Sequence, residues 1–148
     1  MRCVILCFVI LAFGCSKQIV DKSESRIRIG KATQLIDAYG APLRTEIKIN
    51  GANGMSDWIP VNEEQGAKIL EIVRECFVIE FHYPGRPSPS LAAPHWVVRY
   101  TFGDDRELIV QILGRGHLIR LVMGDSMKVL DAEEQQGKIV ELLDLHEK

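Results

Sequence analysis

Four stretches in the second half of the chain alternate apolar and polar residues with a period of two, and this pattern constrains the fold more than any other feature of the sequence. The stretches are residues 77–83, 95–102, 107–113 and 117–123. Glycine-containing turns at residues 103–105 and 114–116 separate the last three stretches, as is typical of β-hairpins. We therefore expect these four stretches to form one antiparallel meander.

Two amphipathic helices are predicted beside these strands. The first covers residues 63–76 and begins at Asn62, with Gln65 placed to complete a capping box. The second follows Asp131, and the spacing of Asp131 and Glu134 also fits a capping box. A shorter helix between Gly30 and Tyr39 and additional strands complete the predicted elements. The additional strands are residues 26–29, 45–49, 58–61 and 127–130.

These elements predict an α+β fold in which the helices pack on one face of an antiparallel sheet. The apolar sides of three strands should meet the helices. Their residues are Phe77, Ile79, Phe81 and Tyr83; Trp96, Val98, Tyr100 and Phe102; and Leu108, Val110 and Ile112. The opposite face of the sheet then has nothing in the sequence to cover it.

An internal repeat relates the two long helices. Residues 63–73 recur as residues 133–143, seventy positions later, with six of eleven residues identical. The upstream pattern Gly-x-Ser at residues 54–56 matches residues 124–126 at the same offset. Amphipathic helices rich in Glu, Lys and Ile can converge on such a pattern, and a duplicated hairpin-helix unit with pseudo-twofold symmetry would also produce it. Both explanations predict the same layers.

The size and charge of the chain exclude several classes of protein. A chain of 148 residues that is 47% hydrophobic is typical of one globular domain, here residues 26–148. A formal net charge of −2 indicates no bulk attraction to nucleic acid. No run of about 18 or more apolar residues is available to span a bilayer.

The first residues of the chain have the pattern of an export signal. Arg2 is followed by eleven uncharged residues, 3–13, a stretch that is too short to span a membrane. This stretch runs into Gly14-Cys15, after which the chain becomes polar at once. Residues 1–15 resemble the lipobox signal of bacterial lipoproteins.

This resemblance implies covalent lipid at Cys15. In that family the cysteine is diacylated, the chain is cut before it, and the new amino group then receives an acyl chain such as palmitate. Residues 1–14 would be a signal peptide and residues 15–25 a lipidated polar tether. In Gram-negative members, Ser16 after the cysteine implies delivery to the outer membrane, facing the periplasm. A plain secretory signal and a start codon assigned too late are the alternatives.

The cysteines indicate that the stability of the domain comes from its hydrophobic core and not from disulfides. Once the signal peptide is removed and Cys15 is lipidated, Cys76 is the one remaining thiol, so no internal disulfide is expected. Its apolar neighbours favour a buried, inert thiol over a reactive one.

A short segment of the domain shows a second resemblance. Residues 30–42, with a helical pattern closed by Gly40-Ala41-Pro42, are weakly similar to the opening helix of small envelope lipoproteins related to β-barrel assembly factors.

The uncovered sheet face is the candidate site for a partner. It combines polar side chains with apolar neighbours, which suits a protein interface, although a solvated antiparallel face has the same pattern. The candidate partner-binding residues are Glu80, His82, Arg99, Gln111 and Arg120. The proline-rich loop at residues 84–94 either contributes to recognition or simply joins two strands.

The sequence contains no motif that specifies an enzyme. The four histidines have no spacing typical of a metal site, no Gly-x-Ser-x-Gly elbow is present, and no cofactor is expected. We expect a lipid-anchored, non-enzymatic envelope protein whose outer sheet face or proline loop binds a protein or an envelope polymer. The alternative is a small hydrolase or ligand-binding enzyme, or an adventitious metal site, centred on Glu80, His82 and His95.

Overall fold

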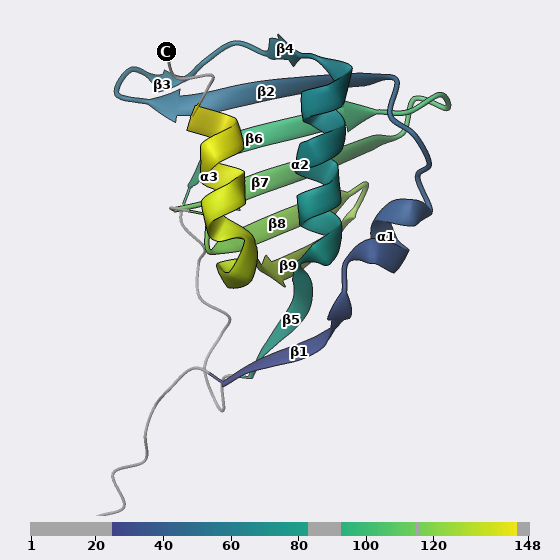
Figure 1. Ribbon diagram of the computed structural model, residues 1–148, viewed down its shortest axis with the longest axis vertical. Helices are drawn as coiled ribbons and strands as arrows, with labels where there is room; N and C mark the ends of the chain where they lie inside the picture. The colour runs from purple at the N-terminus through teal and green to yellow at the C-terminus, as the bar shows by residue number, and fades with distance from the viewer. Residues whose placement is uncertain (1–24, 83–92, 115, 145–148) are drawn as a thin grey trace, which may run out of the picture.

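The computed structural model describes residues 25–82, 93–114 and 116–144. The predicted signal peptide, Cys15, nearly all of the tether and most of the proline loop lie outside these ranges. The described chain is an α+β fold, with one open, antiparallel sheet and its two long helices side by side on one face (Figure 1). This confirms the predicted class and layers.

The strands and helices occur close to the predicted positions. The strands are β1 (Ser25–Lys31), β2 (Arg44–Gly51), β3 (Gly54–Met55), β4 (Ile59–Val61), β5 (Phe77–His82), β6 (Pro94–Thr101), β7 (Glu107–Leu113), β8 (Leu118–Met123) and β9 (Ser126–Asp131). The helices are α1 (Thr33–Asp37), α2 (Glu63–Glu75) and α3 (Gln136–Asp144), the last preceded by a 3₁₀ turn at Glu133–Gln135. Pro60 lies in β4, which among the described strands pairs with β2 alone, and an edge position of this kind suits proline because it has no backbone N–H to donate.

The order of the strands corrects one prediction. The sheet runs β1-β5-β9-β8-β7-β6-β2-β3, with β4 also on β2. Strands β6, β7 and β8 form a meander as expected, and β9 extends it, but β5 does not precede β6 in it. Instead, β5 pairs with β9 and β1. Four antiparallel steps separate β5 from β6, so these two strands run parallel and need a crossover connection. The stretch of eleven residues between them is close to the length that a crossover requires, whereas a hairpin would need only a short turn.

The core lies between the sheet and the helices. Three residues of β6 and three of β7 are buried in it as predicted, together with Phe102 directly after β6. They are Trp96, Val98 and Tyr100, and Leu108, Val110 and Ile112. The prediction for β5 was wrong by one residue. Val78 pairs with Leu130, and Leu130 pairs with Ile119; both of these partners are in the core. Val78 is therefore on the core side of β5, and Phe77 and Ile79 are on the opposite side. Apolar residues occur on both sides of β5, so alternation alone could not decide its orientation.

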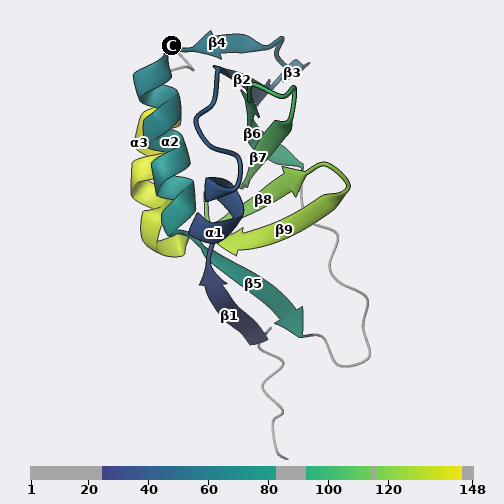
Figure 2. The same ribbon diagram turned by 90° about the vertical axis from the view of Figure 1, so that its right-hand side faces the viewer.

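Helices α2 and α3 run antiparallel across the sheet (Figures 1 and 2). Asn62 caps α2 as predicted, because its side chain accepts a hydrogen bond of 2.8 Å from the backbone of Gln65. The predicted capping box is incomplete, however. The side chain of Gln65 donates to the backbone oxygen of Leu142 at 3.0 Å and thereby joins the start of α2 to the end of α3.

Asp131, which caps the turn before α3, also contacts the distant strand β1. Asp131 accepts a hydrogen bond from the backbone of Glu133 at 3.1 Å, and its other oxygen pairs with Arg28 at 3.1 Å. Glu134 does not complete the capping box but accepts a hydrogen bond from Arg28 at 2.7 Å. Arg28 thus fastens the edge strand β1 to the start of the last helix, and its guanidinium stacks on Phe77.

One close approach sets the distance between α2 and the sheet. The hydroxyl of Tyr100 on β6 donates to the backbone oxygen of Gly66 in α2 at 3.1 Å, and burial raises the pKa of this hydroxyl. A Cβ atom at Gly66 would lie 2.6 Å from Oγ1 and 2.9 Å from Cβ of Thr45 on β2. The glycine therefore allows α2 to rest directly on the sheet.

Within the described ranges, no helix has the length and hydrophobicity needed to cross a bilayer.

Candidate functional site

The sheet face opposite α2 and α3, here called the outer face, brings together three of the five predicted partner-binding residues. Gln111 pairs with Arg120 on β8 and with Val97 on β6, and Arg99 lies two residues along β6 from Val97. Side chains two residues apart in a strand share a face. Arg99, Gln111 and Arg120 therefore lie on one surface, as the sequence predicted. Figure 2 shows both long helices on the other side of the sheet.

The other two predicted residues do not join this surface. Ile79 is in register with Val129, which pairs with Arg120, so Ile79 shares the outer face and Glu80 points to the opposite side. Glu80 is also distant from Arg99, because β5 lies next to the edge strand β1 and three strands separate it from β6. The expectation that Glu80 shares the face was wrong, because it assigned Phe77 and Ile79 rather than Val78 to the core side of β5. His82 is the last residue of β5, and its side chain is not among those that the structure describes.

A tryptophan that the sequence analysis did not include covers part of the outer face. The guanidinium carbon of Arg99 lies 4.1 Å from the centre of the Trp58 ring, and Nζ of Lys48 lies 4.8 Å from it. Two nitrogens of Arg99 also donate to a single oxygen of Glu46, at 3.0 and 2.7 Å. Arg99 is consequently held in one orientation by a ring and a carboxylate, with 21% of its side chain exposed.

The outer face is positively charged although the chain as a whole is acidic. Along β2, β6, β7 and β8 its cations outnumber its carboxylates four to two, whereas the chain carries a formal charge of −2. The six residues are Arg44, Lys48, Arg99 and Arg120, and Glu46 and Glu107. Such local charge favours the approach of an acidic surface.

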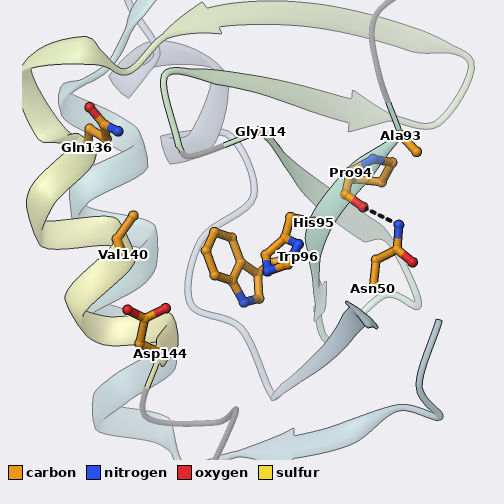
Figure 3. Close-up of a pocket in the computed structure, with 9 residues that line it drawn as sticks. All are labelled: Asn50, Ala93, Pro94, His95, Trp96, Gly114, Gln136, Val140 and Asp144. Carbon is orange, nitrogen blue, oxygen red and sulfur yellow. Dashed lines mark hydrogen bonds between the residues drawn. The ribbon is translucent and has the colours of Figure 1, made fainter. Parts of the chain in front are cut away.

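A pocket separate from the outer face lies at one end of the helix and sheet layers, between β6 and α3 (Figure 3). Its volume is about 620 Å³, within the range of small-molecule sites. Its lining residues come from β2, from the start of β6, from the end of β7 and from α3. They are Asn50, Ala93, Pro94, His95, Trp96, Gly114, Gln136, Val140 and Asp144. We call this cavity the α3 pocket.

A β-bulge shapes this pocket. Pro94 and Trp96 pair with the consecutive residues Leu113 and Ile112, so His95 is an extra residue in β6. A bulge redirects side chains and breaks the alternation of the strand. The ring of His95 packs edge-to-face against Trp96, with ring centres 4.2 Å apart, and both side chains line the pocket. Strict alternation along β6 would instead place His95 on the outer face, beside Val97 and Arg99.

The alternative enzymatic centre is not assembled. Glu80 on β5 and His95 on β6 are separated by β9, β8 and β7, which at the usual strand spacing is about 19 Å across the sheet. In the part of the chain that the structure describes, no group of three or more His, Cys, Asp or Glu side chains is placed to hold a metal ion. Glu80 and His95, two of the three residues named for a hydrolase or metal site, thus share no pocket.

Cys76 is buried directly after α2, with 1% of its surface exposed, in agreement with the inert thiol that the sequence favoured. Burial, reinforced by the negative charges of Asp131 and Glu75, raises the pKa of this thiol to about 12. At pH 8 only about one molecule in ten thousand would then carry the reactive thiolate.

We expect iodoacetamide to alkylate the native Cys76 at least one hundred times more slowly at pH 8 than the unfolded chain, as measured by mass spectrometry of the Cys76 peptide. Stability should also fall as the pH rises from about 9 toward 12, because the unfolded thiol ionises there while the folded thiol keeps its proton. The variant Cys76→Ser, which lacks this group, should lose that part of the alkaline decline. Equal alkylation of the folded and unfolded protein would contradict the assignment.

Comparison with known proteins places this chain in no established group. No family model matches it, and neither the curated proteins nor the solved structures contain a significant match. The geometry of the outer face and of the α3 pocket is therefore the basis for any functional conclusion.

Proposed function

We propose that this protein is a lipid-anchored bacterial envelope protein that uses the outer face of its sheet to bind an acidic surface of a protein partner. The anchor is proposed from the lipobox resemblance of residues 1–15, with acyl chains on Cys15. Two or three acyl chains are sufficient for stable membrane attachment, whereas one chain binds only weakly. The partner would then be met at the membrane surface, without chemical conversion.

The observation that carries the binding role is the position of Arg99 between Trp58 and Glu46. Tryptophan and arginine are the residue types most enriched among those that dominate binding energy at interfaces. Arg99 is already oriented by its contacts at 2.7 Å with Glu46 and 4.1 Å with the Trp58 ring, so little conformational freedom would be lost on binding. Apolar neighbours such as Ile109 and Val122 on the same face supply surface that a partner could bury.

Site-specific photocrosslinking in the native envelope tests this proposal. A photoreactive amino acid at Gln111 lies at the centre of the outer face, and the same group at Ala67 lies on the exposed side of α2 as a matched control. We expect a discrete crosslinked product from position 111 and none from position 67. Raising the ionic strength should weaken capture, because the attraction is between charged surfaces. Equal products from both positions, or none from position 111, would refute the proposal.

The variant Trp58→Ala tests the same surface energetically. Removal of the ring should weaken capture at position 111 at least tenfold, because truncating a central aromatic residue of an interface costs about 2 kcal/mol or more. Its effect on the melting temperature should be small, since the ring is only half-buried. Lys31→Met, which alters a cation on the distant edge strand β1, is the matched control and should leave capture unchanged. A melting temperature that falls together with capture would instead indicate a structural role for Trp58.

We further propose that the chain contains a duplicated hairpin-helix unit. In the first half β2 pairs antiparallel with the three-residue strand β4, and in the second half β8 pairs antiparallel with β9; a helix follows each pair, α2 and α3 respectively. Buried positions repeat at the offset of seventy residues, with Ile69 and Val73 matching Ile139 and Leu143. Under duplication the same offset should recur among relatives of this chain, whereas convergent helices would not preserve it.

A further inference from the structure

We propose that the α3 pocket binds a small neutral molecule that carries an amide group on an apolar body. This site is separate from the outer face, and the proposal does not depend on the lipid anchor or on the partner proposed above. It rests on one buried polar atom, on the chemistry of the pocket wall and on the way the surrounding residues are held.

The buried atom is the indole nitrogen of Trp96. Trp96 is 4% exposed, and no described residue accepts a hydrogen bond from its Nε1–H. Buried donors in folded proteins nearly always have an acceptor, because leaving one unpaired sacrifices the hydrogen bond that it made with water. Figure 3 shows the indole beside α3, with its nitrogen on the side of Asp144 rather than of Gln136. A ligand carbonyl in the pocket would supply the missing acceptor.

The wall of the pocket indicates which ligand would fit. Ala93, Pro94 and Val140 contribute apolar surface, which favours an apolar body. The carboxylate of Asp144 stands at the end of α3 on the same pocket and would repel an anion. It can, however, accept a hydrogen bond from an N–H group. A carbonyl acceptor for Trp96 combined with an N–H donor for Asp144 describes a neutral amide.

The pocket is held in shape before any ligand enters. At the bulge the ring of His95 packs edge-to-face against the indole of Trp96, with ring centres 4.2 Å apart. The side chain of Asn50 donates to the backbone oxygen of Pro94 at 3.3 Å, which ties β2 to the start of β6 beside the cavity (Figure 3). Residues fixed by packing and hydrogen bonds lose little freedom on binding, so a small ligand would not have to organise the site.

Nuclear magnetic resonance of the indole N–H groups tests the proposal, because the chain has only two tryptophans. The protein isolated in its mature form from its own cells, labelled with ¹⁵N, would be titrated with N-acetyl-leucinamide as the probe. We expect the Trp96 indole resonance to move downfield on hydrogen bonding, while that of Trp58 on the outer face stays in place. The variants Trp58→Phe and Trp96→Phe assign the two resonances.

The variants also measure the contribution of each group. Trp96→Phe keeps most of the ring but removes the donor, and should weaken binding of the probe about five- to tenfold by calorimetry. Because Trp96 is in the core, the surface variant Asp144→Leu serves as a second test and should weaken binding by a similar factor without loss of folding. Trp58→Phe should bind the probe as the unaltered protein does.

Three results would overturn the proposal. The first is a Trp96 resonance that does not move at millimolar probe, and the second is equal movement of both resonances, which would mean nonspecific contact. The third is a Trp96 resonance that is already in the hydrogen-bonded range without probe, because the chain would then supply the acceptor itself. Equal affinity of Trp96→Phe and the unaltered protein would likewise exclude the indole as a ligand group.

Discussion

Replacement of Cys15 by Ser should abolish lipid attachment and leave an uncut precursor, because in the lipoprotein family that residues 1–15 resemble the cysteine is acylated before the chain is cut. The proposed anchor is formed by acyl chains on this one sulfur, and each buried methylene contributes about 0.8 kcal/mol to membrane affinity. Serine cannot receive the thioether-linked lipid, so the effect should be nearly complete. Metabolic labelling with an alkyne analogue of palmitate measures the loss of lipid, and mass spectrometry of the N-terminal peptide detects the precursor that still carries residues 1–14.

The control for this experiment is the other cysteine of the mature chain. Cys76→Ser should keep the label, because Cys76 is buried in the domain. Mass spectrometry of the unaltered protein should find an N-terminus at Cys15 that carries acyl groups. An intact chain that begins at Met1 without lipid would exclude the anchor and favour a start codon assigned too late. Cleavage without lipid would favour a plain secretory signal.

Replacement of Gly66 by Ala should destabilise the domain, although alanine is normally the better helix residue. The new Cβ would lie 2.6 Å from Oγ1 and 2.9 Å from Cβ of Thr45, which is itself buried with 6% exposure. Overpacking of this kind typically costs about 1–3 kcal/mol. This exceeds the gain of about 1 kcal/mol that alanine offers over glycine inside a helix. The helix would also have to move away from Tyr100, which donates to the backbone oxygen of Gly66.

Gly137→Ala is the matched control for this prediction. Gly137 lies in α3, and a Cβ added there would meet no atom of the other described elements within 4 Å. This substitution should therefore stabilise the domain by up to about 1 kcal/mol. Denaturant unfolding of both variants gives the two free energies. Stabilisation by both substitutions would show that α2 is not pressed against β2.

The sequence was sufficient to locate most of the elements. Alternation with period two identified the strands of the meander, because an antiparallel sheet with helices on one face has apolar side chains on that face and more polar side chains on the face toward solvent. The helical stripe of residues 63–76 likewise follows from a helix that lies on a sheet. The shared position of Arg99, Gln111 and Arg120 was predictable for the same reason, since neighbouring strands joined by short turns have a register that local sequence determines.

The candidate sites were less predictable because they depend on contacts between distant segments. Glu80 was placed on the wrong face because β5 has apolar residues on both sides. It was placed near Arg99 because no local pattern reports that three other strands separate β5 from β6. Trp58 was not recognised as part of the outer face, although a tryptophan beside an edge strand with Pro60 was a visible signal. The bulge at His95, which shapes the α3 pocket, consists of one extra residue and leaves the apolar pattern around it nearly unchanged.

The chain's own residues determined where strands, helices and turns form, because those choices depend on side chains within a few positions of one another. Tertiary structure alone decided that β5 crosses to β9, that Trp58 lies against Arg99, and that Trp96 meets α3 around a cavity. Each of these contacts joins residues whose proximity is set by packing of the whole sheet against two helices. The free energy of that packing is shared among many side chains, so it leaves no signature at any single position in the sequence.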